Sequence, residues 1–220
     1  MLIINSPHNP SGAILSKEDL QALEDIVDET GLFVLSDEVY EHIVLDGAEH
    51  QSVLRSESLR AHSIVVSSFG KTFHATGWRI GYLIAPARLT EEIRKVHQYN
   101  TFTIHTPTQL AIADYLKDPV NYRGVSSLYQ QKKDLFLEVM KESRFEPIPS
   151  HGTFFQLMNY AQISDRHDVE FAECLTKEVG VAAIPTSVFY QDGTDNKVLR
   201  FCFAKGEETL KAAADKLCKL

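Results

Sequence analysis

Four short segments of the chain are almost purely apolar, and each leads into a stretch of polar residues. They cover residues 2–5, 32–35, 63–67 and 80–85. Apolar runs of this length between polar turns are typical of strands buried on both faces, which occur in parallel or mixed sheets covered by helices. A segment with leucine, isoleucine and valine at helical spacing separates the first two runs. The pattern therefore predicts an α/β fold with a mainly parallel sheet.

The helix between the first two strands has clear ends in the sequence. Ser16 is suited to cap its N-terminus, and Glu18 and Asp19 would lie in the first turn, where the helix dipole favours negative charge. Gly31 is predicted to end the helix, because glycine readily adopts the left-handed conformation that closes many helices. The next apolar run follows at once, so strand and helix alternate in this part of the chain.

The second half of the chain has a different order of elements. A long helical region is expected over residues 107–143, with a break near Pro119. Strands are predicted at 154–158, 181–184 and 198–203, and helices at 168–179 and 207–217. This order is typical of an α+β domain. We therefore predict two parts, with residues 1–105 belonging to a large domain and residues 106–220 forming a small C-terminal α+β domain.

Composition excludes several classes of partner. Apolar residues make up 44% and charged residues 24%, as in an ordinary globular protein. The formal net charge of −8 argues against a nucleic-acid surface, which needs clustered positive charge. No apolar run approaches the roughly 20 residues of a membrane-spanning helix. Three widely spaced cysteines and scattered histidines suggest neither a disulfide framework nor a metal site. We expect a cytoplasmic protein with no metal, nucleic-acid or membrane partner.

Chemically capable side chains follow the predicted strands. They are Asn9, Asp37, Tyr40, Ser68, Lys71 and Arg79, together with Arg200 in a late strand. Ligands of open α/β sheets bind at the carboxyl ends of the strands. This set suits a phosphorylated pyridine aldehyde, because a lysine amine forms an imine with the aldehyde and a carboxylate keeps the ring nitrogen protonated. One arginine can bind the phosphate, and the other can bind a substrate carboxylate in the same forked geometry.

Three sequence blocks resemble the signature motifs of class I and II aminotransferases, which are pyridoxal-phosphate (PLP) enzymes of fold type I. The blocks are Asn-Ser-Pro-His-Asn-Pro-Ser-Gly at 5–12, Ser-Asp-Glu-Val-Tyr at 36–40 and Ser-Phe-Gly-Lys-Thr-Phe-His-Ala-Thr-Gly-Trp-Arg-Ile-Gly at 68–81. Residues 93–99 and 180–189 resemble the methionine and aromatic aminotransferase subgroup most. The resemblance implies a PLP-transferase fold of type I, a PLP cofactor and a homodimer. It also implies amino-group transfer from an L-amino acid, with methionine or aromatic donors favoured, to a 2-oxo acid.

The resemblance implies roles for the residues around the cofactor ring. Lys71 resembles the catalytic lysine that carries PLP as a Schiff base and later transfers a proton. Asp37 resembles the partner of the pyridine nitrogen, and Asn9 and Tyr40 resemble the pair that hydrogen-bonds the ring oxygen. Residues 1–105 would then be the C-terminal part of the large PLP-binding domain.

Phosphate and substrate binding are implied in the same way. Ser68 and Arg79 resemble the cofactor's phosphate ligands, and Arg200 resembles the arginine that binds the substrate α-carboxylate. An unpaired guanidinium within an apolar strand is costly, which independently favours a binding role for Arg200.

The resemblance further implies an N-terminal half preceding the first strand. We therefore expect this chain to be the truncated C-terminal portion of such an enzyme, with exposed apolar sheet faces and an unpaired sheet edge. Two alternatives remain open. One is a related PLP chemistry on the same fold, such as a carbon–sulfur lyase. The other is a fragment without catalytic activity that serves as an interaction module.

Overall fold

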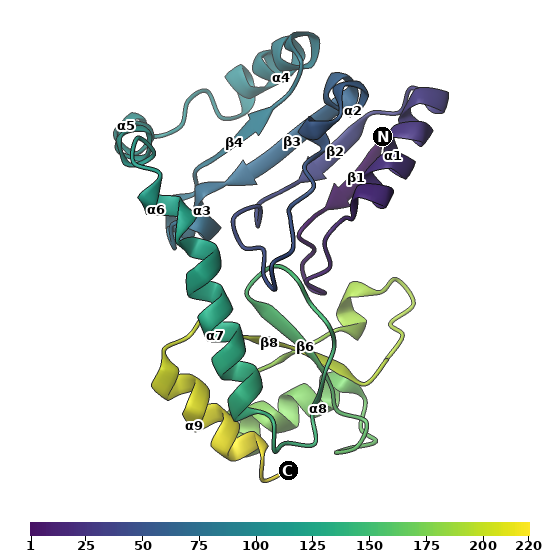
Figure 1. The fold of residues 1–220 in the computed structure, drawn as a ribbon, viewed down its shortest axis with the longest axis vertical. Coiled ribbons are helices and arrows are strands. Elements are labelled where there is room, and N and C mark those ends of the chain that lie inside the picture. The colour runs from purple at the N-terminus through teal and green to yellow at the C-terminus, as the bar shows by residue number, and fades with distance from the viewer. The chain divides into compact units, whose positions relative to one another are not determined.

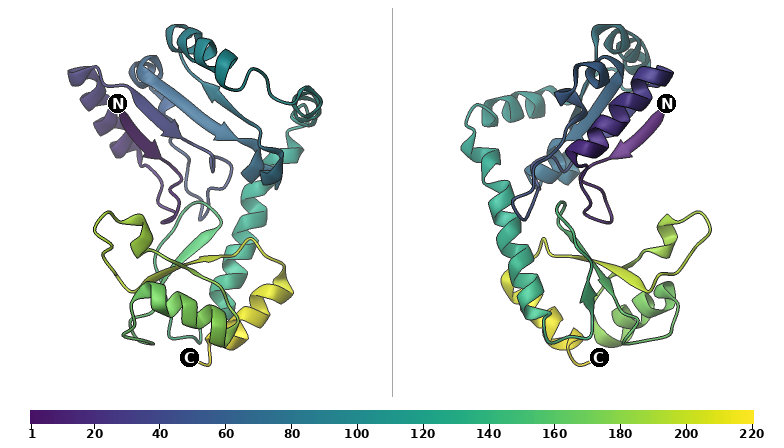
Figure 2. Two further views of the ribbon diagram at one scale, coloured as in Figure 1. Left: turned by 180° about the vertical axis from the view of Figure 1, so that it is seen from behind. Right: turned by 45° about the vertical axis from the view of Figure 1, so that its right-hand side comes forward.

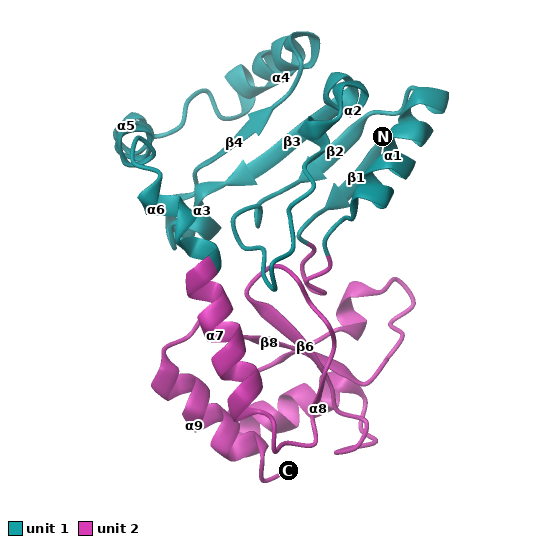
Figure 3. Ribbon diagram, viewed as in Figure 1, with its two compact units in different colours: residues 1–7, 14–126 teal, residues 8–13, 127–220 magenta.

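The computed structural model describes residues 1–220, which form two compact units (Figure 3). Unit 1 comprises residues 1–7 and 14–126, and unit 2 comprises residues 8–13 and 127–220. The loop at 8–13 thus belongs to unit 2, although the chain on both sides of it belongs to unit 1. These units describe packing within the chain, and the domain boundary between residues 105 and 106 remains a prediction.

Unit 1 is built on a four-stranded sheet in the order β1-β2-β3-β4 (Figure 1). The strands are β1 (Leu2–Asn5), β2 (Val34–Asp37), β3 (Ser63–Ser68) and β4 (Gly81–Ile84). The first three are parallel to one another, and β4 runs antiparallel to β3. The predicted α/β fold with a mainly parallel sheet is confirmed.

The helices of unit 1 agree with the predicted pattern in part. They are α1 (Lys17–Thr30), α2 (Glu57–His62), α3 (Phe69–Thr72), α4 (Ala87–Asn100), α5 (Thr106–Tyr115) and α6 (Val120–Arg123), with 3₁₀ turns η1 (Val53–Arg55) and η2 (Thr76–Trp78). Of these helices, α2 and α3 were not expected. Ser16 caps α1 in a capping box with Asp19, and Gly31 ends it in the left-handed region at φ 64°. The break expected near Pro119 lies between α5 and α6.

One face of the first sheet carries the core of unit 1. Leu20, Leu23 and Val27 of α1 pack with Leu59 of α2 against inward side chains of β2 and β3. The opposite face of the sheet is much less covered, and Ile3 in β1 is 64% exposed. Because β1 and β4 are the outer strands, each has a free hydrogen-bonding edge in this sheet. These features agree with the expected exposed faces and unpaired edge.

Unit 2 contains an antiparallel sheet in the order β5-β6-β8-β7. Its elements are α7 (Val125–Val139, which begins in unit 1), β5 (Glu146–Pro147), β6 (Phe155–Asn159), α8 (Asp168–Cys174), the π-helical turn η3 (Leu175–Val179), β7 (Ile184–Pro185), the 3₁₀ turn η4 (Ser187–Phe189), β8 (Val198–Cys202) and α9 (Glu207–Leu217). The predicted α+β pattern is confirmed, although β7 is shorter and later than the strand expected at 181–184.

Aromatic side chains form the core of unit 2. Phe201 of β8 lies 6.2 Å from Phe136 of α7 and 5.6 Å from Phe145, measured between ring centroids. Phe171 of α8 packs on Phe145 and on the fully buried Tyr160. Figure 2 shows α8 and α9 together beside the strands of this unit. Side chains alternate along a strand, so Val198 and Arg200 point to the face opposite Phe201.

No helix in the structure combines the length and the apolar character that a bilayer-crossing segment requires.

Candidate active site

The predicted residues of unit 1 gather at the edge where β2 and β3 end. Asp37 is the last residue of β2 and pairs with Val66 of β3, two positions before Ser68 ends that strand. Since side chains alternate along strands, Asp37, Val66 and Ser68 share one face of the sheet. The helix-covered core lies on the other face, with Val65. Asp37 and Ser68 therefore stand on the open face, at the carboxyl ends of neighbouring parallel strands.

Both the backbone carbonyl and the carboxylate of Asp37 accept hydrogen bonds from neighbouring segments. Its carbonyl oxygen accepts hydrogen bonds from Asn5 Nδ2 at 2.9 Å and from the Ser6 amide at 3.1 Å. Its carboxylate Oδ1 accepts the amide N–H of Val39 at 3.1 Å. Tyr40, three residues on, is only 2% exposed. The expected roles of Asp37 at a ring nitrogen and of Tyr40 at a ring oxygen remain predictions.

A small cavity of about 190 Å³ contains three predicted site residues of unit 1. Its lining is Ser68, Gly70, Lys71, Thr76, Arg79, Ile80 and Gly81. The chain leaves β3, makes the short helix α3 that carries Lys71, and returns as β4 with Gly81 opposite Ser68. A hydroxyl, an ammonium and a guanidinium around one cavity make it suited to an anionic group.

Backbone conformation shapes this cavity. Arg79 has φ 53°, in the left-handed region that non-glycine residues rarely adopt, and its Nη1 donates to the Thr76 carbonyl at 3.2 Å. A Cβ on Gly81 would lie 2.5 Å from the Ser67 carbonyl oxygen, so a larger residue there would have to displace backbone. A Cβ on Gly70 would lie 3.0 Å from the Thr76 Cα. The glycines allow the chain segments around the cavity to approach closely.

Glu38 supports the loop beside Asp37. It is 2% exposed, and its carboxylate accepts hydrogen bonds from Ser36 Oγ at 2.9 Å, His50 Nε2 at 2.9 Å and the Val53 amide at 3.2 Å. Burial tends to raise the pKa of Glu38, but the hydrogen bonds from His50 and from neighbouring serines outweigh it and lower that pKa below its usual value. The ionised carboxylate therefore ties β2 to the segment that follows it.

Unit 2 carries the other two predicted residues, and it joins them directly. Arg200 Nη1 donates to Asn9 Oδ1 at 2.7 Å, although the two residues are 191 positions apart. The guanidinium carbon lies 4.1 Å from the ring centroid of Phe155 in β6 and 5.7 Å from that of Phe189 in η4. These contacts hold the planar guanidinium by a hydrogen bond and by aromatic faces.

The loop at 8–13 brings Asn9 into unit 2. The Gly12 amide donates to the His8 carbonyl at 2.7 Å, and the His151 amide donates to the Gly12 carbonyl at 2.8 Å. Gly12 has φ 70°, and a Cβ there would lie 2.6 Å from Ser150 Cβ. Only glycine allows this close approach, so Gly12 determines how the loop packs on the segment around Ser150.

A larger cavity of about 580 Å³ lies in unit 2 beside Arg200. Its lining is His8, Asn9, Pro10, Ser11, Ile148, Leu157, Thr186, Phe189, Tyr190, Asn196 and Val198. Leu157 pairs with Arg200 across β6 and β8, so both side chains lie on one face of the sheet. Burial lowers the pKa of His8, whose Nδ1 lies 2.7 Å from Ser11 Oγ. Most of its lining surface is apolar, and its polar groups come from the loop at 8–13 and from Thr186 and Asn196.

The sequence predicts seven site residues, and the structure divides them between the two units. Asp37, Tyr40, Ser68, Lys71 and Arg79 lie in unit 1, and the remaining two lie in unit 2. Sequence reasoning missed the Asn9–Arg200 contact and the two aromatic rings over Arg200. Phe155 and Leu157 are two positions apart in β6, and this spacing could have indicated that both lie on the sheet face of Arg200. No nearby residue indicated that Phe189 contacts Arg200.

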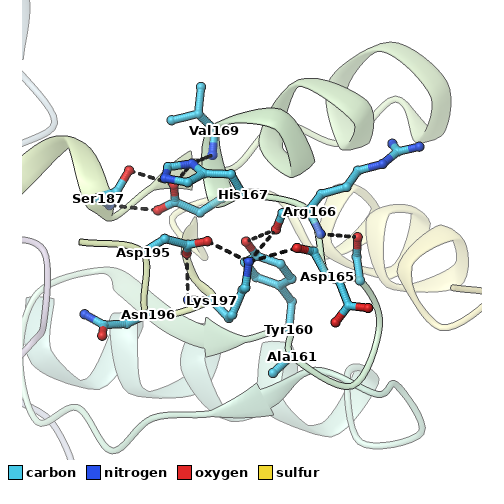
Figure 4. A network of polar contacts seen from close by, with 12 residues as sticks. Tyr160, Ala161, Asp165, Arg166, His167, Val169, Ser187, Asp195, Asn196 and Lys197 are labelled. Carbon is cyan, nitrogen blue, oxygen red and sulfur yellow. Dashed lines mark hydrogen bonds and ion pairs between the residues drawn. The ribbon is translucent and has the colours of Figure 1, made fainter. Parts of the chain in front are cut away.

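A second polar network in unit 2 includes His167, Ser187, Asp195 and Lys197 (Figure 4). Lys197 Nζ contacts Asp195 Oδ2 at 2.8 Å and donates to the Arg166 carbonyl at 3.0 Å. Asp168, which is fully buried, accepts hydrogen bonds from Ser187. Ligand-type atoms of His167, Asp168 and Asp195 lie within 4.8 Å of one another. Protein donors engage the carboxylates of both Asp168 and Asp195.

Comparison with known proteins gives consistent matches. The sequence matches the family "Aminotransferase class I and II" over residues 1–217. Methionine aminotransferase of Escherichia coli (strain K12) is 49% identical over 221 residues, covering 100% of this chain and 57% of that protein. Kynurenine–oxoglutarate transaminase of Dictyostelium discoideum is 35% identical over 244 residues, covering 100% of this chain and 56% of that protein.

Solved structures match equally well. An Escherichia coli protein reported to have a methionine aminotransferase function superimposes with a TM-score of 0.96 at 49% identity, covering 99% of this chain and 57% of that one. N-succinyldiaminopimelate aminotransferase from Mycobacterium tuberculosis superimposes with a TM-score of 0.93 at 35% identity, covering 99% of this chain and 57% of that one. The chain thus spans a little over half the length of the relatives it matches.

Proposed function

This chain belongs to the class I and II aminotransferases, and from that premise we propose that it is the lysine-bearing part of an enzyme that moves an amino group from an L-amino acid to a 2-oxo acid. The observation that carries the proposal is the cavity in unit 1 that Ser68, Lys71 and Arg79 line together. It supplies an amine, a hydroxyl and a guanidinium at the carboxyl end of a parallel strand, where α/β sheets bind ligands.

The family depends on pyridoxal phosphate, and the residues of unit 1 fit this cofactor. Ser68 and Arg79 would bind its phosphate, beside glycines that keep side chains out of the cavity. Lys71 would attach it covalently, and Asp37, on the same sheet face as Ser68, would hold the ring nitrogen. Tyr40 and Asn9 Nδ2 are the expected donors to the ring oxygen.

PLP, when bound, supplies an electron-withdrawing ring that makes the Cα–H bond of the substrate acidic. The chain's own groups then act on the proton and the charges. Lys71 Nζ would take the proton from the substrate Cα and pass it to the cofactor carbon. The carboxylate of Asp37 stabilises a positive charge at the ring nitrogen, which keeps the electron withdrawal strong.

Arg200 would orient the donor substrate. Its guanidinium offers two parallel N–H groups to an α-carboxylate, and Asn9 and Phe155 restrain it. A substrate carboxylate held in this way presents its Cα in one orientation, which increases the rate of proton transfer. These roles of Arg200 and Lys71 are part of the proposal.

We further propose that the amino donor has an apolar side chain, with methionine or an aromatic amino acid favoured. The support is the cavity of about 580 Å³ beside Arg200, whose lining includes Ile148, Leu157, Phe189 and Val198. An apolar pocket of this size suits a thioether or an aromatic ring. The similarity to a methionine aminotransferase and to a kynurenine transaminase points in the same direction.

Cofactor binding by the purified chain provides the first test. We expect a weak imine absorbance when PLP is added, and Lys71→Ala should abolish it because the amine is then missing. Lys95→Ala, on the exposed surface of α4, is the matched control and should leave the absorbance intact. Absorbance that survives Lys71→Ala would contradict the assignment of this lysine.

Product analysis tests the reaction class. The chain is incubated with PLP, L-methionine and 2-oxoglutarate, and we expect any turnover to form glutamate. Release of ammonia without need for an oxo acid would instead indicate a carbon–sulfur lyase. Imine formation without any turnover would indicate that these 220 residues bind the cofactor but do not complete the catalytic machinery.

A further inference from the structure

Asp168 is the most deeply buried carboxylate of unit 2, and one residue engages both of its oxygens. Its side chain is 0% exposed. Oδ2 accepts the amide N–H of Ser187 at 2.7 Å, and Oδ1 accepts the hydroxyl of the same serine at 2.6 Å. The exposed His167 Nδ1 lies 3.1 Å from Oδ1 (Figure 4). Two hydrogen bonds to one residue fix both its position and its orientation.

Ser187 begins the turn η4, so the carboxylate sets where that turn starts. The preceding Thr186 is tied to β8, because its hydroxyl donates to the Val198 carbonyl at 3.0 Å. Within the turn, the Phe189 amide donates to the Thr186 carbonyl at 3.1 Å. Thr186 and Ser187 are both less than 5% exposed, whereas Phe189 is 50% exposed. The buried residues Thr186 and Ser187, each held by hydrogen bonds, therefore support the exposed aromatic ring of Phe189.

The ring of Phe189 is the link to the substrate-binding group. Its centroid lies 5.7 Å from the guanidinium carbon of Arg200, within the range of a cation–π contact, and it also lines the cavity of unit 2. Being half exposed, Phe189 has little packing of its own to hold it. Its place over Arg200 therefore depends on the anchored start of the turn.

We propose that Asp168 is a positioning residue for Arg200, acting through the bidentate anchoring of Ser187 and the placement of the Phe189 ring. The inference rests on the proposed role of Arg200 in binding the substrate carboxylate. A buried carboxylate is a costly way to fill core volume, since an apolar residue would do so without desolvating a charge. The ionic acceptor is useful here because it takes two donors from one serine at once.

The test observes Arg200 itself in the purified chain. Its Nε–H signal is followed by NMR in a sample with ¹⁵N-labelled arginine, and its disappearance in Arg200→Lys provides the assignment. We expect Asp168→Asn to shift this signal and to increase the mobility of Nε, because the NH₂ group that replaces one carboxylate oxygen cannot accept a hydrogen bond from Ser187. Ser187→Ala removes only the hydroxyl, so it should change the Arg200 signal in the same direction but by less. This variant replaces Asp168→Asn in the test if Asp168→Asn does not fold.

The matched control is Asp195→Asn, which makes the same chemical change in the same polar network. Asp195 contacts Lys197 and not Ser187, so the Arg200 signal should stay in place. If Asp168→Asn lowers the melting temperature while the position and mobility of the Arg200 signal are unchanged, Asp168 is only structural and the proposal is overturned.

Binding of 3-phenylpropanoate, an apolar carboxylate, adds a functional measurement. We expect its Kd to rise roughly tenfold in Asp168→Asn, the size typical of a change transmitted through neighbouring residues. An unchanged Kd together with an unchanged Arg200 signal would refute the positioning role. If Arg200→Lys binds the probe as well as the wild type does, the proposed carboxylate role of Arg200 fails, while the Nε signal still decides whether Asp168 positions it.

Discussion

Single residues in this chain act mainly by what they allow the backbone to do around them. Gly81 and Gly12 permit close approaches that a Cβ would prevent, one beside Lys71 and the other within the loop that carries Asn9. Glu38 acts through its side chain instead, because its buried carboxylate accepts hydrogen bonds from Ser36, His50 and Val53 near the end of β2. The reactive side chains are thus placed by neighbours that do no chemistry themselves.

Gly81→Ala should disturb the pairing of β3 with β4 and the cavity that follows it. The new Cβ would lie 2.5 Å from the Ser67 carbonyl oxygen, so we expect a loss of about 1–3 kcal/mol in the free energy of unfolding and a weaker PLP absorbance. Gly77→Ala is the matched control, because nothing lies within 4 Å of its added Cβ. Denaturant unfolding measures both variants, and equal effects would contradict the steric explanation.

Glu38→Gln should destabilise the chain at neutral pH and remove part of its acid sensitivity. A lowered pKa in the folded state means that the carboxylate contributes fully above its ordinary value of 4.5, and that the contribution fades as the pH falls below it. We expect a loss of about 1–3 kcal/mol at pH 7 that shrinks as the solution is acidified. Urea unfolding as a function of pH measures it. A loss of stability that does not depend on pH would contradict this electrostatic explanation. Glu92→Gln, at an exposed position, is the control and should not change the free energy of unfolding.

Secondary-structure elements are defined by signals that lie close together in the sequence. The capping box of α1 needs only Ser16 and Asp19, three residues apart, and Gly31 needs only its own backbone freedom. The polar ends of β2 and β3 follow apolar runs directly. This is why the helix, the strands and the candidate residues after them were predictable, while the direction of β4 was not.

Ser16→Ala should reveal how much the cap stabilises α1. The hydroxyl accepts the Asp19 amide N–H at 3.0 Å, and the Asp19 carboxylate accepts the Ser16 amide N–H at 2.9 Å. We expect Ser16→Ala to cost about 1 kcal/mol of unfolding free energy. Each residue accepts a hydrogen bond from the backbone of the other, so the two contributions are coupled. The double variant with Asp19→Ala should therefore lose less unfolding free energy than the sum of the two single variants. Strict additivity in denaturant unfolding would argue against a reciprocal box.

At the scale of the whole molecule, two sheets each have one face covered by helices and one that carries candidate site residues. In unit 1 the open face also exposes apolar side chains, and β1 and β4 are its unpaired edges. Exposed apolar edge strands promote association between chains. This surface, unlike the polar surface of α1, gives the isolated chain a specific route to self-association.

The isolated chain should therefore associate with itself as its concentration rises, and a charge on the edge strand should reduce this. Ile3, 64% exposed in β1, is the position for the change to lysine. Ile26→Lys, at a 46% exposed site on α1, is the matched control and should leave association unchanged. Sedimentation velocity over a concentration series measures it. A chain that stays monomeric throughout, or equal effects of both variants, would contradict the role of this edge.

Much of the candidate site was predictable, but only as separate residues. Lys71, Asp37 and Ser68 were predicted because they follow apolar strands within recognisable motifs. The sharing of one sheet face by Asp37 and Ser68 needed the register of β2 and β3, which the sequence does not state. The attachment of η4 to Asp168 through Ser187 needed the packing of η4 on α8, and no local pattern marks it.

The sequence by itself determined where strands and helices form, where helices end and which reactive side chains follow the strands, because these depend on interactions between near neighbours. Only the tertiary structure decided that the loop of Asn9 belongs to unit 2 and that Asn9 meets Arg200 across 191 positions. Such contacts follow from strand register and from the packing of distant segments. Those are sums of many weak, non-local interactions, and no short stretch of sequence contains them.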